Sequence, residues 1–292
     1  MNKITFLSFP GLGIDEFRVE SEAFKIFGVS IAWYAVIITF GMVLCTLYVI
    51  NRAKKIGMTS EDVVDFALFV IPIGIVGARL YYVLSEIEHY DTFKDVINIR
   101  EGGLAIYGGI IAGGITVLCM CYFKKVNFFA FADCVAPGVL LAQAVGRWGN
   151  FMNGEAFGKE ITSDFFLRMG IQNSNSFYTF KTTSMVYVHP TFLYESLWNI
   201  TGFVLVNLYA KYVGKKYDGQ LFLFIFAWYG FGRMFIELLR TDSLYLGDTN
   251  IRISSLLGGI IFAITASALV YFVFKKPDKP LYFKAPKQIK KK

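Results

Sequence analysis

The chain has 292 residues, of which 55% are hydrophobic and only 17% are charged. Soluble domains carry about 25% charged residues, so this composition excludes an ordinary soluble domain and indicates a polytopic membrane protein. The net charge of +7 lies mostly in loops and in the C-terminal region. We interpret it as membrane topology and contact with anionic lipid rather than nucleic-acid binding.

Seven apolar stretches reach the length of about 20 residues that a helix needs to cross a bilayer. They cover residues 27–50, 63–84, 104–123, 127–147, 190–210, 219–240 and 253–274. Their long continuous runs favour helices over a barrel, whose strands alternate in polarity. We therefore expect an all-α polytopic membrane protein with seven transmembrane helices, forming a single membrane domain over residues 1–292.

The distribution of lysine and arginine among the connections predicts the orientation. One set of alternate connections, ending with the C-terminal region, carries sixteen of these residues, and the other set carries nine among many acids. The N-terminus is therefore expected outside and the C-terminus inside. Residues 154–188 then form an extracytoplasmic cap or arm, and residues 275–292 form a basic cytoplasmic tail.

The seven stretches contain no lysine, although the chain has 20, but they contain four of its nine arginines. These are Arg79, Arg147, Arg233 and Arg240. An arginine near the bilayer centre costs at least about 2.5 kcal/mol, and its planar group is best compensated by a carboxylate or phosphate. All four lie in the outer halves of their stretches, on the side where we also expect Tyr34, Tyr107 and His189. This placement predicts a polar cavity that opens outward.

Glycines in the third and fourth stretches indicate close approach of backbones. Gly109 and Gly113 have the spacing typical of tightly packed membrane helices. The fourth stretch closes with "GRWGNFMNGEAFG", residues 146–158, which combines glycines with Arg147, Asn150, Asn153 and Glu155. Neither a core nor a lipid-facing helix requires such polarity, so this segment must meet water, an anion, or both.

The sixth stretch carries polar residues at spacings of four, four and three, which place them on one face of a helix. They are Tyr229, Arg233, Glu237 and Arg240. The alternative, an Arg233–Glu237 pair that only neutralises itself, leaves the other two unexplained. Glu195, inside the fifth stretch, needs an internal partner, for which an arginine is expected. His189 either belongs to the same polar site or caps this helix.

The four cysteines, Cys45, Cys119, Cys121 and Cys134, lie in apolar stretches without paired spacing, which is typical of structural filling. The chain has only two histidines besides. We expect neither a metal site nor a cofactor.

With these residues assembled, the chain resembles the prolipoprotein diacylglyceryl transferase family. The segment 146–158 fits the signature G-R-x-G-N-F-x-N-x-E followed by glycine, and "HPTFLYE" and "YGFGRMFIELLR" follow in order. The resemblance runs from "IAWYAV" to the last stretch. It implies a bacterial plasma-membrane enzyme that moves the diacylglyceryl group of phosphatidylglycerol onto the lipobox cysteine of a prolipoprotein signal peptide. A thioether forms and glycerol 1-phosphate is released.

The resemblance also implies site residues. The signature places Arg147, Asn150, Glu155 and Gly158, and the family pattern of the first and sixth spans places Tyr34, Tyr229, Arg233 and Glu237. Many family members have histidine before the Gly–Gly pair of the third span, where this chain has Tyr107. An imidazole base at that position therefore cannot act here unchanged.

These assignments give two groups of residues. The catalytic group is Arg147, Arg233, Tyr107 and Glu237. The substrate-binding group is Tyr34, Asn150, Asn153, Glu155, Gly158, His189, Glu195, Tyr229 and Arg240. We expect the arginines to bind phosphate, the asparagines to donate to phosphate or glycerol, and the glutamates to hold the arginines. The base stays open between Tyr107, His189, a carboxylate and water.

Two other classes of protein have to be weighed. A transporter or flippase for an anionic lipid or metabolite would also place arginines inside the membrane. However, the polar groups gather in the outer half, and no internal repeat with matching interrupted helices is present. A seven-span receptor would explain the number of spans but not the arginines.

Overall fold

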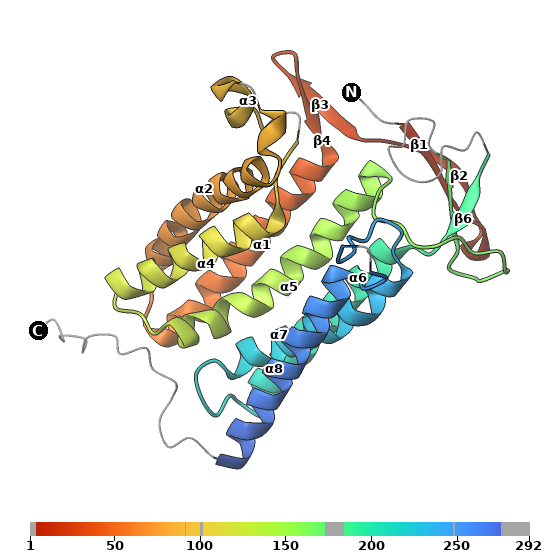
Figure 1. Cartoon of the computed structure of the whole chain (residues 1–292). Helices are drawn as coiled ribbons and strands as arrows, with labels where there is room; N and C mark the ends of the chain where they lie inside the picture. The colour runs from red at the N-terminus through yellow and green to blue at the C-terminus, as the bar shows by residue number, and fades with distance from the viewer. Residues whose placement is uncertain (1–3, 91, 100–101, 173–183, 248, 276–292) are drawn as a thin grey trace, which may run out of the picture. The chain divides into compact units, whose positions relative to one another are not determined.

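The computed structural model describes residues 4–90, 92–99, 102–172, 184–247 and 249–275 (Figure 1). The described residues divide into two compact units, one formed by those within 1–45 and 135–275, the other by those within 46–134. Helices α1 (Trp33–Ala53) and α5 (Phe128–Asn153) each run from one unit into the other. Most of the predicted basic tail, residues 276–292, lies outside the described residues.

Among the described residues, six helices are long and apolar enough to cross a membrane. They are α1, α2 (Ser60–Ser85), α4 (Ile106–Phe123), α5, α7 (Gln220–Ile236) and α8 (Ile253–Lys275). The predicted helical, polytopic membrane protein is thereby confirmed. Helix α6 (Thr191–Tyr212) has 22 residues, but polar side chains such as Glu195, Asn199 and Asn207 lower its hydropathy. The seventh span and the orientation stay predictions.

The apolar helices expose large apolar side chains, as expected where lipid replaces water. Examples that are more than half exposed are Leu68, Phe69, Val76, Ile110, Ile264 and Val270. A soluble protein would bury most such residues, whereas hydrocarbon chains solvate them without cost.

The first unit contains β-structure that the sequence analysis did not predict. Strands β1 (Ile4–Phe9), β2 (Ile14–Glu20), β5 (Met169–Gln172) and β6 (Val186–Val188) form an antiparallel sheet in the order β2-β1-β5-β6. Buried Leu7, Met169 and Val188 belong to its core, into which Phe192 at the start of α6 also packs. The predicted arm, residues 154–188, therefore supplies two strands to a sheet completed by the N-terminal hairpin.

A second hairpin, β3 (Glu22–Ile26) and β4 (Val29–Ala32), precedes the first membrane helix. The sequence analysis began that span at Phe27, but α1 begins at Trp33. Phe27 instead lies in the tight turn with a φ of 47°. The apolar residues of the hairpin raise the local hydropathy as a helix would, which explains the early start.

Helices α5, α6 and α7 share a buried apolar core in the first unit. Its members are Ala136, Leu140, Val206, Leu221 and Ile225. Helix α8 packs on α7 where Gly230 meets Gly258. This close approach requires glycine, because a Cβ at Gly230 would lie 2.6 Å from the Gly258 carbonyl oxygen. These contacts fix the helices that carry most of the predicted site residues.

Helices α2 and α4 pack closely in the second unit. A Cβ at Gly108 would lie 2.3 Å from the Gly77 carbonyl oxygen, so only glycine permits this approach. The predicted close packing of the third span is confirmed. However, its tightest contact is at Gly108, whereas a Cβ at Gly109 or Gly113 would lie at least 3.4 Å from its neighbours.

Candidate functional site

The carboxylate of Glu195 is the centre of an arginine cluster in the first unit. Glu195 lies in the second turn of α6, and only 5% of its surface is exposed. Arg147 Nη2 lies 2.5 Å from Oε2, and Arg233 Nη1 and Arg240 Nη1 each lie 3.2 Å from Oε1. The expected arginine partner of Glu195 is therefore confirmed, and there are three of them. Their positive charge compensates the burial of a carboxylate in an apolar helix.

Glu237 extends this cluster from the end of α7. It is 1% exposed, and its Oε2 lies 2.7 Å from Arg233 Nη2 and 4.0 Å from Arg240 Nε. The predicted single helical face is changed at this point, because α7 ends at Ile236 and Glu237–Leu239 form a 3₁₀ turn. Arg233 thus bridges two buried carboxylates, one on its own helix end and one on α6.

Asp242 and Arg252 belong to the same cluster, and the sequence analysis missed both. Arg240 donates to Asp242 through two parallel bonds, Nε to Oδ1 at 2.9 Å and Nη2 to Oδ2 at 2.6 Å. Although burial raises the pKa of Asp242, the hydrogen bonds and charge of Arg240 lower it below its usual range overall. Arg252 Nη1 donates to the backbone carbonyls of Glu237 and Arg240. The only sequence signal was the polar segment that follows Arg240.

Residues 146–153 of the signature segment form the last two turns of α5, and residues 154–158 follow the helix. Arg147 Nη1 donates to Asn150 Oδ1 at 3.4 Å, one turn further along the helix. Asn150 Nδ2 and Asn153 Nδ2 donate to Glu155 Oε1 at 3.0 Å and 3.2 Å. The helix ends at Asn153, and the next residue, Gly154, has a φ of 60°. The amide of Asn150, expected to bind phosphate, therefore links Glu155 to Arg147, and that of Asn153 holds Glu155 as well. Among the described residues, Glu155 forms no direct ion pair with an arginine.

Two signature glycines explain how other site residues approach this segment. A Cβ at Gly149 would lie 2.8 Å from the ring of Tyr34, so glycine lets Tyr34 on α1 pack against α5. A Cβ at Gly158 would lie 2.6 Å from the Cβ of His189. Gly158 also donates its N–H to the His189 carbonyl at 2.8 Å. Gly149 thus brings Tyr34 next to α5, which carries Arg147. Gly158 brings His189 next to the segment that follows α5.

His189 does not cap α6, because Pro190 is the N-cap residue and makes no side-chain cap bond. The imidazole Nδ1 lies 3.2 Å from the hydroxyl of Tyr194. Burial lowers the pKa of His189, which keeps the ring neutral near pH 7. A neutral imidazole has a nitrogen that can accept a proton.

A pair of tryptophans, Trp198 on α6 and Trp228 on α7, joins the two helices and positions the cluster. The sequence analysis missed this pair. Trp198 Nε1 donates to the Trp228 carbonyl, and Trp228 Nε1 donates to the Trp198 carbonyl, both at 3.0 Å. A Cβ at Gly232 would lie 2.1 Å from Trp198 Nε1. Because Gly232 precedes Arg233 in the chain, this contact helps to set Arg233 opposite α6. The signal was two tryptophans in apolar helices, whose N–H groups need partners.

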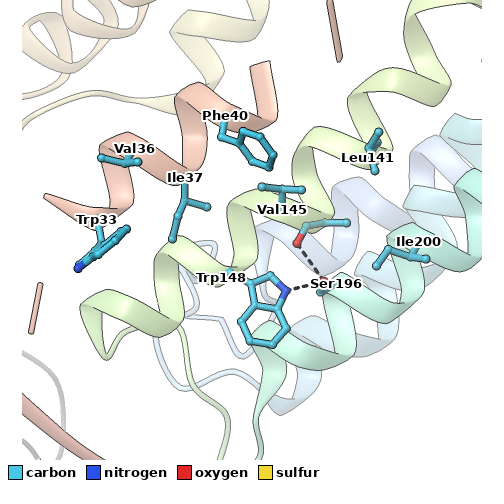
Figure 2. A pocket seen from close by; sticks show the side chains of 10 residues that line it. Trp33, Val36, Ile37, Phe40, Leu141, Val145, Trp148, Ser196 and Ile200 are labelled. Carbon is cyan, nitrogen blue, oxygen red and sulfur yellow. Dashed lines mark hydrogen bonds between the residues drawn. The ribbon is translucent and has the colours of Figure 1, made fainter. Parts of the chain in front are cut away.

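An apolar cavity of about 370 Å³ adjoins the cluster. Figure 2 shows its walls, which come from α1 (Val36, Ile37 and Phe40), α5 (Leu141 and Val145) and α6 (Ile200). At one side Trp148 Nε1 donates to Ser196 Oγ, which donates to the Ala144 carbonyl. Trp148 directly follows Arg147 and Ser196 directly follows Glu195, so the cavity lies beside the two residues that form the closest ion pair of the arginine cluster.

The first unit thus contains all of the predicted site residues except one. Tyr229 lies partly buried on α7, one turn before Arg233. Tyr107 belongs to the second unit, where it occupies the first turn of α4 with 37% of its surface exposed. Among the described residues, no group of three or more His, Cys, Asp and Glu side chains could hold a metal ion.

Buried arginines paired with carboxylates at the ends of apolar helices are characteristic of a polytopic membrane protein that handles an anion at the bilayer. The chain belongs to the prolipoprotein diacylglyceryl transferase family, whose model matches residues 21–271. The identification made from the signature, that of a membrane transferase, is confirmed.

Curated relatives match over most of their length. A phosphatidylglycerol–prolipoprotein diacylglyceryl transferase of Clostridium perfringens is 41% identical over 268 residues, which cover 89% of this chain and 98% of the relative. The transferase of the same name from Enterococcus faecalis is 41% identical over 94% of this chain and 97% of its own length. The one from Listeria monocytogenes is 39% identical over 94% of this chain and 98% of its own length.

Proposed function

We propose that this chain transfers the diacylglyceryl group of phosphatidylglycerol to the thiol of a lipobox cysteine in prolipoprotein signal peptides. A thioether forms and glycerol 1-phosphate leaves. The observation that carries the proposal is the convergence of Arg147 and Arg233 on the buried carboxylate of Glu195. The names of the relatives indicate the same two substrates.

The arginine pair suits the charge that develops in this reaction. The side chains of Arg147 and Arg233 keep 21% and 16% of their surface exposed, so part of each guanidinium can reach a headgroup. Glu195 and Glu237 hold the two guanidiniums in fixed positions. Donors fixed in this way stabilise a leaving phosphate at no cost in reorganisation when its charge grows.

The reaction is a displacement at a glyceryl carbon. The substrate thiolate donates an electron pair to form the C–S bond, the C–O bond to phosphate breaks, and its electron pair leaves with the phosphate oxygen. A free thiol has a pKa of about 8.5, and neighbouring guanidiniums increase the thiolate fraction. The base that receives the thiol proton stays open between Tyr107, neutral His189, a carboxylate and water.

The cavity beside the cluster is the proposed site of one acyl chain. The cavity of about 370 Å³ is too small for one turn of a peptide helix, which is about 10 Å wide and 5.4 Å long and occupies roughly 420 Å³. Its apolar walls suit an extended hydrocarbon chain instead. A chain placed there would leave its headgroup near Arg147.

We further propose that α6, the fifth span in chain order, completes a set of seven spans in a bacterial plasma membrane, with the N-terminus outside. Its 22 residues extend about 33 Å, enough for about 30 Å of hydrocarbon, and its polar Glu195 and Asn199 are buried. Residues 154–188 then lie outside. In a cysteine-free background, Asp164→Cys should react with an impermeant maleimide in intact cells, whereas Lys216→Cys should react only after permeabilisation. The reverse pattern would contradict this orientation.

The activity is tested by mass spectrometry of a lipobox peptide incubated with the purified protein in phosphatidylglycerol vesicles. We expect the mass gain of one diacylglyceryl group, none with phosphatidylethanolamine vesicles, and a rate about 10²–10³-fold lower with the Arg147→Ala variant. A folded protein that moves phosphatidylglycerol between leaflets without modifying the peptide would instead support the transporter reading.

A further inference from the structure

Arg79 on α2 binds backbone carbonyls, as Arg252 does, whereas Arg147, Arg233 and Arg240 pair with carboxylates. Its Nε donates to Val96 O at 2.8 Å and its Nη2 to Asp95 O at 2.7 Å. Its Nη1 donates to Gly102 O at 3.0 Å and Gly103 O at 2.9 Å. The side chain stacks over the ring of Tyr90 and is 8% exposed. One guanidinium therefore joins the end of α3 (Phe93–Ile97) to the segment that enters α4.

The two glycines in this segment adopt conformations that other residues rarely adopt. Gly102 and Gly103 have φ values of 95° and 76°. A Cβ at Gly103 would lie 2.2 Å from Arg79 Nη1 and 3.0 Å from the ring of Tyr82. Glycine at this position leaves the space that the guanidinium fills, so the backbone turn and Arg79 depend on each other.

The neighbours of Arg79 on α2 hold the residues that follow these glycines. Ala105 donates its N–H to the Ala78 carbonyl at 3.0 Å, and Gly108 packs on Gly77. Three consecutive residues of α2 thus hold residues 102–108, and Tyr107 lies within that segment.

We propose that Arg79 is a positioning residue for the transferase reaction, because it fixes the entry to α4 and thereby the direction of the Tyr107 phenol. The proposal rests on Tyr107 being the base of the proposed reaction, which is one of the four candidates named above. A lysine offers three donors from one atom and cannot span carbonyls on both sides, whereas the planar guanidinium can. The effect of Arg79 should therefore be lost in Arg79→Lys as well as in Arg79→Gln.

The kinetic test uses the purified full chain in phosphatidylglycerol vesicles. We expect Arg79→Gln and Arg79→Lys to lower kcat by about 10²-fold, as a misplaced reacting group does, with little change in KM for the lipid. Adding Tyr107→Phe should cause no further loss, since both changes remove the same group from its place. Arg52→Gln is the matched control, because Arg52 also stacks on a tyrosine, Tyr48, in the same unit.

A spin label tests the positioning directly in a cysteine-free background. A label at Leu104 should gain mobility in Arg79→Gln, while a label at Leu118, further along α4, should not. Wild-type turnover in Arg79→Gln, additive losses with Tyr107→Phe, or an unchanged label at Leu104 would each overturn the proposal. If Tyr107→Phe alone turned over normally, the role of Tyr107 would fail. Slow turnover with a mobile Leu104 label would then still assign the positioning of residues 102–108 to Arg79.

Discussion

Trp198 and Trp228 stack with ring centroids 4.1 Å apart, and each indole N–H donates to the backbone carbonyl of the other residue. The contact joins α6 to α7 one turn from Glu195 and close to Arg233. It depends on glycine, because the indole of Trp198 occupies the place of a side chain at Gly232.

Gly232→Ala should therefore lower turnover by about 10²-fold, since a Cβ must displace Trp198 and with it the alignment of Glu195 and Arg233. The measurement is the rate of peptide modification in phosphatidylglycerol vesicles. Gly114→Ala is the control, because a Cβ there would meet nothing within 4 Å. Equal rates for the two variants would show that the Trp198–Trp228 contact does not position Glu195 and Arg233.

Arg147→Lys and Arg147→Ala should both lower turnover by about 10²–10³-fold while the protein still folds. Arg147 contacts Glu195 through one nitrogen and Asn150 through another, and a lysine ammonium cannot reproduce this fork. Arg18→Lys, at an exposed pair with Glu20, serves as control. Near-normal turnover in Arg147→Lys would mean that charge alone suffices there.

Glu195→Gln should be more damaging than Glu237→Gln. Glu195 is within 3.2 Å of three guanidiniums, whereas Glu237 has one ion pair of 2.7 Å and a longer one. Removing one partner from a buried ion pair costs about 3–5 kcal/mol, so the melting temperature in detergent should fall further for Glu195→Gln. An equal or opposite order would contradict the central place of Glu195.

Filling the apolar cavity should change the preference for lipid chain length. Val36→Phe or Ile200→Phe should slow transfer from long-chain phosphatidylglycerol more than from a short-chain form, whose hydrocarbon need not enter the cavity. The measurement is the ratio of the two rates, with Ile264→Phe on exposed α8 as control. A loss independent of lipid chain length, seen as a raised KM for the peptide, would assign the cavity to the signal peptide instead.

The pH dependence of kcat/KM tests His189 as the base. Its pKa is lowered from the ordinary value of 6.5 by burial, so the imidazole stays neutral at that pH and gains a proton only at lower pH. If His189 is the base, the rate should fall only below about pH 6.5, and His189→Gln should abolish this acid limb. An acid limb that persists in His189→Gln would transfer the role to another group.

The membrane helices could be predicted because length and hydropathy decide them. The predicted spans 63–84 and 253–274 differ from α2 and α8 by at most three residues at either end. The start of α1 could not be predicted in the same way, because residues 27–32 are apolar in a hairpin as they would be in a helix. Hydropathy measures burial in lipid or protein but does not register strand pairing.

The site was predictable to the extent that charge demands a partner. A glutamate inside an apolar helix required an arginine, and Glu195 has one. That three arginines share it depends on the packing of α5, α6 and α7, which no local pattern encodes. Asp242 was missed because it lies beyond the apolar stretch. The partners of Arg79 could not be predicted because they are main-chain carbonyls, which every residue possesses.

The signature segment is helical up to Asn153, and this has a consequence for how the segment can vary. Each residue of an α-helix turns the chain by about 100°, so one inserted or deleted residue between Arg147 and Asn150 would rotate everything after it by that angle. Asn150 would leave Arg147, and Gly149 would no longer face Tyr34. A substitution at an outward position of this helix changes one side chain, whereas an insertion or deletion rotates every residue that follows it. The spacing of this stretch is therefore under stricter constraint than the identity of any lipid-facing residue within it.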